Sequence, residues 1–184
     1  TIVLKDADIE KAVIEVVNGA YLFSGQVCMG VKRVIVEHEI IDEFTQKLIE
    51  ETKKLKVGNP SSTDTDIGPL INKKAAENVN SKVEDAVCNG ATIEVGGKMK
   101  DNFYWPTVIS NVREDIKLVS DETFGPVAPI IEAEDIDDAI AIANNTQYGL
   151  NAGVFTNNID DAIKCADAIE SGSVFINKAS TNNF

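Results

Sequence analysis

Cys28 is the residue of this 184-residue chain whose surroundings suit chemistry best. It lies between Gly25 and Gly30, where a helical pattern stops and an apolar run typical of a strand begins. Because glycine tolerates backbone conformations that other residues resist, the chain can turn sharply on both sides of the sulfur. The turn would present the thiol and the backbone N–H of Cys28 to one small volume, as nucleophilic attack on a carbonyl requires. The alternative is a buried cysteine that only fills space.

A second candidate is the carboxylate of Glu122, which precedes Phe124 in a loop made rigid by glycine and proline. On its own, such a carboxylate is better explained as a solvated residue of the loop. His38 is the one histidine; it is ten residues from Cys28 on a separate predicted element, and we expect it at the surface. A cysteine acyltransferase or hydrolase needs a nearby histidine base. That class stays open as an alternative, together with a catalytically silent scaffold or assembly domain.

The composition excludes several classes of function. Seventeen basic and thirty acidic residues give a net charge of −13, which disfavours binding to nucleic acid or to anionic membranes. No apolar run approaches about 18 residues, and no signal peptide is visible. Three cysteines without paired spacing, Cys28, Cys88 and Cys165, argue against a disulfide scaffold, and with a single histidine no metal site is expected. Reduced thiols predict a cytoplasmic protein.

The order of the apolar patterns predicts an α/β fold with an open, mostly parallel, twisted sheet and helices on both faces. Such sheets place ligands at the carboxyl ends of their strands, so we expect the site there. Cys88 and Cys165 fall within helical patterns and are expected in the core. Helices are predicted over 9–23, 40–55 and 73–88 and from Ile136 and Ile159 onward, and strands over 33–37, 91–95, 103–109, 127–131, 151–155 and 172–176.

The segment Gly25-Gln26-Val27-Cys28 resembles the Gly-Gln-x-Cys catalytic segment of the NAD(P)-dependent aldehyde dehydrogenase superfamily. Segments 66–71, 122–127 and 144–150 agree with this family in order and spacing, and the resemblance extends from Thr1 to Asn177. The cysteine segment and residues 31–33 look most similar to the branch that contains the lactaldehyde, non-phosphorylating glyceraldehyde-3-phosphate and succinate-semialdehyde dehydrogenases.

The resemblance implies a mechanism and a cofactor, NAD or NADP. Cys28 would add to an aldehyde, a hydride would pass to the cofactor, and water would hydrolyse the resulting thioester. The family pattern implies that Glu122 binds the nicotinamide ribose and that Phe124 packs beside the nicotinamide.

The resemblance also implies which residues approach the substrate, namely Gln26, Val27 and Asn177. In the glyceraldehyde-phosphate enzymes the residue before the cysteine is often arginine, a natural contact for phosphate, whereas here it is Val27. We therefore expect a small, uncharged or hydroxylated aldehyde such as lactaldehyde.

By the same resemblance, residues 1–184 correspond to a catalytic domain fragment. The family's glutamate base, its dinucleotide-binding domain and the C-terminal segment that builds its oligomers are not among these residues. No Gly-x-Gly-x-x-Gly sequence occurs in the chain. We expect the chain to fold, to be inactive by itself, and to belong to a protein that forms homo-oligomers.

Overall fold

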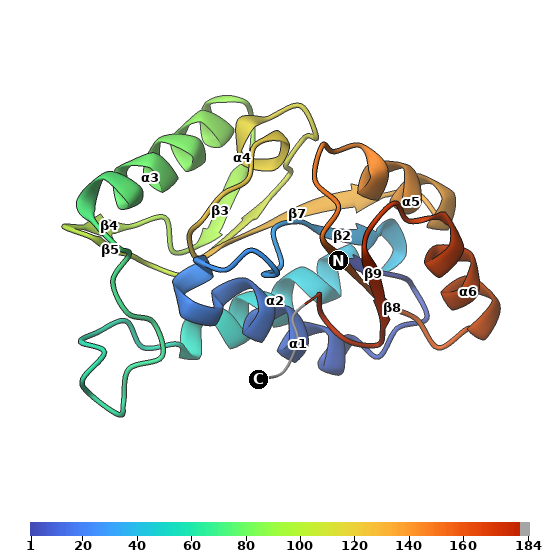
Figure 1. The fold of residues 1–184 in the computed structure, drawn as a ribbon, viewed down its shortest axis with the longest axis horizontal. Helices are drawn as coiled ribbons and strands as arrows, with labels where there is room; N and C mark the ends of the chain where they lie inside the picture. The colour runs from blue at the N-terminus through green and yellow to red at the C-terminus, as the bar shows by residue number, and fades with distance from the viewer. Residues whose placement is uncertain (181–184) are drawn as a thin grey trace.

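A computed structural model describes residues 1–180, which form a seven-stranded sheet, a separate two-stranded pair and six α-helices (Figure 1). The large sheet contains β1 (Ile2–Val3), β2 (Val34–Glu37), β3 (Thr92–Val95), β6 (Thr107–Ser110), β7 (Val127–Ala133), β8 (Asn151–Phe155) and β9 (Ser173–Ile176). The small pair is β4 (Met99–Lys100) and β5 (Phe103–Tyr104). The helices are α1 (Ile9–Tyr21), α2 (Ile41–Lys54), α3 (Lys73–Cys88), α4 (Lys117–Ser120), α5 (Ile136–Asn144) and α6 (Ile159–Ala168).

The strand order of the large sheet is β3-β6-β7-β2-β1-β8-β9, and β3 is the one strand of it that runs antiparallel to its neighbour. The two-residue strand β1 lies between β2 and β8, with Ile2 in register with Ile35 and with Val154. The prediction of an α/β fold with a mostly parallel sheet is confirmed.

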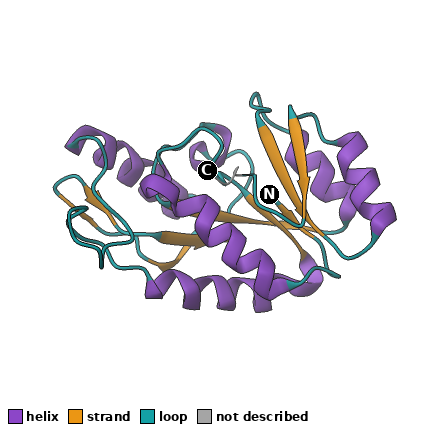
Figure 2. Cartoon of the chain, turned by 60° about the horizontal axis from the view of Figure 1, so that its bottom comes forward, coloured by secondary structure: helices purple, strands orange, loops and turns teal. Residues whose placement is uncertain are grey.

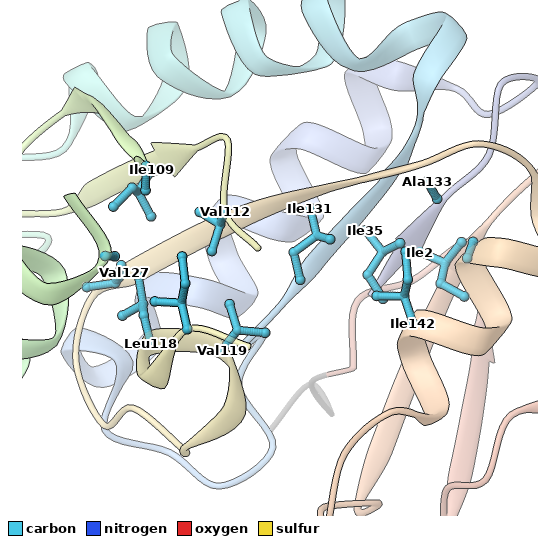
Figure 3. Close-up of a cluster of buried hydrophobic side chains, with 14 of the residues drawn as sticks. Ile2, Ile35, Ile109, Val112, Leu118, Val119, Val127, Ile131, Ala133 and Ile142 are labelled. Carbon is cyan, nitrogen blue, oxygen red and sulfur yellow. The ribbon is translucent and has the colours of Figure 1, made fainter. Parts of the chain in front are cut away.

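Helices cover both faces of the sheet, as Figure 2 shows. Neighbouring residues of a strand point to opposite faces, so Ile2 and Val3 belong to different buried clusters. The cluster around Val3 includes Val16 of α1 and Phe44 of α2. The cluster around Ile2 is shown in part in Figure 3; it includes residues of α3, α4, α5 and α6. None of the helices in residues 1–180 is long and apolar enough to cross a membrane.

Helices α1, α3, α5 and α6 begin at side chains that accept hydrogen bonds from the first free N–H groups, whereas α2 has no side-chain cap. Asp8 accepts from the N–H of Lys11 at the start of α1, and Asn72 accepts from the N–H of Ala75 at the start of α3. Helix α3 ends before Gly90, whose φ of +100° is left-handed, as the Asn-Gly sequence predicts.

The expected burial of Cys88 is wrong, whereas that of Cys165 is confirmed. Cys88 is exposed because the inward positions of α3 are 76, 79, 83 and 86, and the next one falls beyond the helix. Cys165 lies on the inner side of α6, where burial, and secondarily the carboxylate of Asp161, raises its pKa to about 11.

Candidate active site around Cys28

The turn that carries Cys28 begins with three consecutive residues in the left-handed region. Phe23, Ser24 and Gly25 have φ values of 48°, 58° and 73°, and they reverse the chain immediately after α1. For the two non-glycine residues this conformation costs roughly 1–2 kcal/mol each. Backbone strain of this kind persists only where surrounding contacts enforce it, and it is concentrated at functional sites.

Hydrogen bonds to the segment 68–71 hold this turn. The Ser24 hydroxyl donates to the carbonyl of Gly68 at 2.9 Å. The Gln26 side-chain oxygen accepts from the N–H of Ile71 at 2.9 Å, and its amide nitrogen donates to the carbonyl of Phe23 at 3.3 Å. Both ends of the Gln26 carboxamide therefore bind backbone, which fixes the strained turn that leads to Cys28.

Gly25 also brings the cysteine segment against the loop that contains Glu122. A Cβ atom on Gly25 would lie 2.0 Å from the carbonyl oxygen of Gly125 and 2.8 Å from the nitrogen of Pro126. Only glycine permits this backbone contact, and its φ of +73° also favours glycine. The contact explains how two segments almost one hundred residues apart in the sequence come together.

The exposed Cys28 lines a cavity of about 430 Å³ together with Lys32, Glu122 and Thr123. Residues at the start of β1 and β8 complete its wall, so the cavity lies at the amino ends of the parallel strands. The expectation of a site at the carboxyl ends is wrong for this sheet. The reason is topological: Cys28 precedes β2 and Glu122 precedes β7, and these two parallel strands are neighbours.

Lys32, which the sequence analysis did not single out, contacts both segments of the site. Its Nζ donates to the carbonyl of Gly25 at 2.9 Å and to that of Thr123 at 3.2 Å, and it lies 4.4 Å from the centre of the Phe124 ring. Burial lowers the pKa of Lys32, and the nearby Glu122 and Cys28 act in the opposite direction.

Lys82 of α3 is a second lysine that the sequence analysis missed. Its Nζ donates to the carbonyl of Glu122 at 2.8 Å and to the hydroxyl of Thr123 at 3.4 Å. Burial lowers the pKa of Lys82, whereas the nearby carboxylates of Asp121 and Glu122 act to raise it. A signal for Lys82 was present in the sequence, because this lysine adjoins Val83, an inward-facing position of α3.

The remaining predicted residues lie in different places. Val27 is half-buried, and its carbonyl accepts from the N–H of Gly30 at 3.2 Å in the turn around Cys28. Asn177 follows the carboxyl end of β9, where its side chain accepts from the N–H of Thr156 at 3.1 Å and donates to the carbonyl of the same residue at 2.9 Å. The structure brings neither Val27 nor Asn177 to the cavity wall, and Gln26 and Phe124 also lie outside it.

Three further observations define the chemistry of the cavity. Within residues 1–180, no protein acceptor is hydrogen-bonded to the backbone N–H of Cys28, so this donor is free for a bound group. The same residues contain no cluster of three or more side chains that could hold a metal ion. His38 is exposed and is not part of the cavity wall, so it is not placed to act as a base for the Cys28 thiol.

A model of the Aldehyde dehydrogenase family matches residues 1–184 of the chain. The chain belongs to the aldehyde dehydrogenase family. Among the curated members of this family, it is 46% identical over 180 residues to lactaldehyde dehydrogenase of Methanococcus maripaludis and equally to 3-sulfolactaldehyde dehydrogenase of Priestia aryabhattai. Each match covers 98% of this chain but 38% of the relative, so the chain spans little more than a third of their length.

Solved structures of aldehyde dehydrogenases have the same fold as residues 1–180. The glyceraldehyde-3-phosphate dehydrogenase GapN from Methanocaldococcus jannaschii, complexed with NADP, is 41% identical with a TM-score of 0.96, and the match covers 100% of this chain and 40% of that chain. Lactaldehyde dehydrogenase from Escherichia coli is 37% identical with a TM-score of 0.95, over 99% of this chain and 39% of that chain.

Proposed function

We propose that the protein containing this chain oxidises a small aldehyde to a carboxylate with NAD or NADP, and that Cys28 is the nucleophile. The observation that carries the proposal is the exposed Cys28 thiol, with its unpaired backbone N–H, in a cavity shared with Glu122. The family of the chain gives the reaction type.

The proposed reaction begins when the Cys28 thiolate adds to the aldehyde carbon and forms a carbon–sulfur bond. The carbonyl oxygen becomes an oxyanion, which the N–H of Cys28 can stabilise. When bound, the oxidised nicotinamide supplies the acceptor for the hydride that leaves this carbon with its electron pair. Collapse of the oxyanion gives a thioester at Cys28. Addition of water then releases the carboxylic acid and restores the thiol.

The cofactor contacts that we propose are made by Glu122 and Phe124. The Glu122 carboxylate forms no ion pair with any residue in the described part of the chain, although it lines the cavity of Cys28. The Phe124 ring is 43% exposed and is held by Lys32. A free carboxylate at the cavity wall and an exposed ring two residues further along the chain fit the hydroxyls of a ribose and the flat face of a nicotinamide.

We propose an uncharged aldehyde of the lactaldehyde type as substrate. Two cationic side chains line the cavity, Lys32 and Arg33, and both already donate to backbone carbonyls. Three acidic residues, Asp121, Glu122 and Glu170, share the wall, which disfavours a phosphate or sulfonate group.

Of the residues first assigned to the substrate, Val27 is the one that we still propose beside it, because it adjoins Cys28 and carries no charge. We propose that Gln26 and Asn177 act indirectly, since their carboxamides bind backbone groups of Phe23, Ile71 and Thr156.

The test is NAD(P)H formation by the longest protein that contains these residues, with lactaldehyde as substrate. We expect Cys28→Ser to abolish turnover and Cys88→Ser to leave it unchanged, because Cys88 is equally exposed but does not line the cavity. If Cys28→Ser and Cys88→Ser both retain turnover, the proposal is contradicted. A higher kcat/KM for glyceraldehyde 3-phosphate than for lactaldehyde would contradict the substrate assignment alone.

Glu122→Gln tests the cofactor contact in the same protein. The carboxylate would orient the nicotinamide ribose, so its loss should reduce kcat by about tenfold or more, with a smaller change in the KM for the cofactor. Unchanged kcat with a large rise in that KM would contradict the role.

We also propose a cytoplasmic homo-oligomer. The three thiols are free, as expected in a reducing compartment. Apolar side chains of α6 and β9 are exposed in residues 1–180, among them Ile159 at 71% and Ile176 at 41%, and would be covered by a second copy. Size-exclusion chromatography with light scattering tests the oligomeric state, and a monomer at micromolar concentration would contradict it.

A further inference from the structure

Two lysine ammonium groups hold the main chain at Glu122 and Thr123 from different sides. Lys82 approaches from α3 and binds the carbonyl of Glu122 and the hydroxyl of Thr123. Lys32 approaches from the segment before β2 and binds the carbonyl of Thr123. The same Lys32 ammonium binds the carbonyl of Gly25, so one group joins the cysteine segment to the glutamate segment.

Within residues 1–180, neither Lys32 nor Lys82 forms the ion pair with a carboxylate that is usual for a lysine in a structural role. A cation that is withdrawn from water usually pairs with a carboxylate, because its desolvation is otherwise unfavourable. In the described part of the chain, neither Lys32 nor Lys82 lies within 4 Å of a carboxylate oxygen. Their partners are backbone carbonyls, a hydroxyl and, for Lys32, the face of Phe124.

We propose that Lys32 and Lys82 are positioning residues, which fix the segment of Glu122 relative to Cys28 so that cofactor and nucleophile meet in a productive geometry. Lys32 additionally places a positive charge at the wall of the cavity, beside the thiol. This inference rests on the proposed aldehyde oxidation. Its first test, however, does not require any turnover.

The first test is cleavage by a glutamate-specific protease. The bond after Glu122 is protected while the two lysines hold its flanking carbonyls, and Thr123 is buried. Lys32→Met and Lys82→Met should accelerate cleavage at this bond by about tenfold or more, because local opening becomes easier. Lys73→Met is the matched control, since Lys73 forms an exposed pair with Glu77 on α3. Equal cleavage rates in all variants would overturn the proposal.

The second test compares a neutral and an anionic alkylating reagent at Cys28. A positive charge beside the thiol favours iodoacetate relative to iodoacetamide. The ratio of the two rates should fall several-fold in Lys32→Met and stay constant in Lys73→Met. A ratio that does not change in Lys32→Met would contradict the placement of its charge.

The third test is steady-state kinetics with the longest protein that contains the chain. A displaced Glu122 segment should lower kcat by about 10- to 100-fold, while the KM for the aldehyde changes much less. A purely structural role would instead lower thermal stability and leave kcat per folded molecule unchanged, which would overturn the inference. If Lys32→Met does not fold, Lys32→Gln, which retains a donor, replaces it. Absence of turnover in the parent protein would contradict the proposed function, whereas the protease test would still decide the inference.

Discussion

The two exposed cysteines of the chain differ in one respect, which is that Cys28 lines the cavity and Cys88 does not. Both should therefore react with iodoacetamide in the folded chain, but a ligand of the cavity should protect Cys28 alone. We predict that millimolar lactaldehyde slows alkylation of Cys28 and leaves the rate at Cys88 unchanged. Peptide mapping by mass spectrometry measures both rates in one sample. Equal protection of the two thiols would place the aldehyde elsewhere.

The buried thiol of Cys165 predicts a dependence of stability on alkaline pH. Its pKa is raised from 9.0 to about 11 in the folded chain, so the unfolded chain loses this proton first as the pH rises. The contribution of the neutral thiol is complete below pH 9 and is lost as the pH approaches 11. Relative to Cys165→Ala, the free energy of unfolding should fall by about 2 kcal/mol between pH 8 and 10.5. Urea denaturation at each pH measures this, and a constant difference between the two proteins would show that the thiol is not buried.

For individual residues, the sequence predicts the role or the burial of some side chains well and of others poorly. Cys28 and Gly25 are recognisable because their types and spacing are unusual. Lys32 and Lys82 are not, because their acceptors are backbone carbonyls of segments far away in the sequence. The predicted burial of Cys88 is wrong because the residue continues the apolar pattern of α3 at its last turn. No other helix or strand of residues 1–180 covers this side chain, so it stays exposed.

At the scale of elements, the contact between the loops at Gly25 and Gly125 is the most sensitive point of the fold. Gly25→Ala combines a left-handed backbone with a Cβ 2.0 Å from a carbonyl oxygen. We predict a loss of more than about 3 kcal/mol in the free energy of unfolding, and displacement of the Glu122 loop. Gly90→Ala is the control: its φ is +100°, but nothing lies within 4 Å of the new Cβ, so about 1 kcal/mol is expected. Urea denaturation compares them, and equal losses would contradict the importance of the contact.

The positions of the elements were largely predictable, because the apolar periodicities and the capping residues agree. The predicted ranges 73–88 and 151–155 coincide with α3 and β8. The end of the sheet that carries the site was not predictable from these patterns. It depends on which loops become neighbours, and β2 and β7 become neighbours although about ninety residues separate them.

The whole molecule, taken as residues 1–184 alone, should fold but lack aldehyde dehydrogenase activity. We expect residues 1–184 to fold, because two buried clusters cover both faces of the sheet. We do not expect them to sustain aldehyde oxidation with NAD(P), because the chain contains no Gly-x-Gly-x-x-Gly turn for a dinucleotide. NAD(P)H formation by the purified chain, with lactaldehyde and saturating NAD, is the measurement. Sustained turnover that disappears in Cys28→Ala would contradict this expectation.

The position of the cavity at the amino ends of the strands has an electrostatic consequence. Helices in a parallel α/β sheet run opposite to the strands, so this edge receives their carboxyl termini, the negative poles of their macrodipoles. Helix α1 ends just before Cys28, and α5 ends beside the cavity, where Arg33 donates to the carbonyls of Ile142 and Ala143. Neither of these two helices offers an amino terminus to an anion there, so positive potential comes from the side chains of Lys32 and Arg33 and from the free N–H of Cys28. Loss of either cation would leave the cavity to the negative helix ends and to the acidic residues Asp121, Glu122 and Glu170 of its wall.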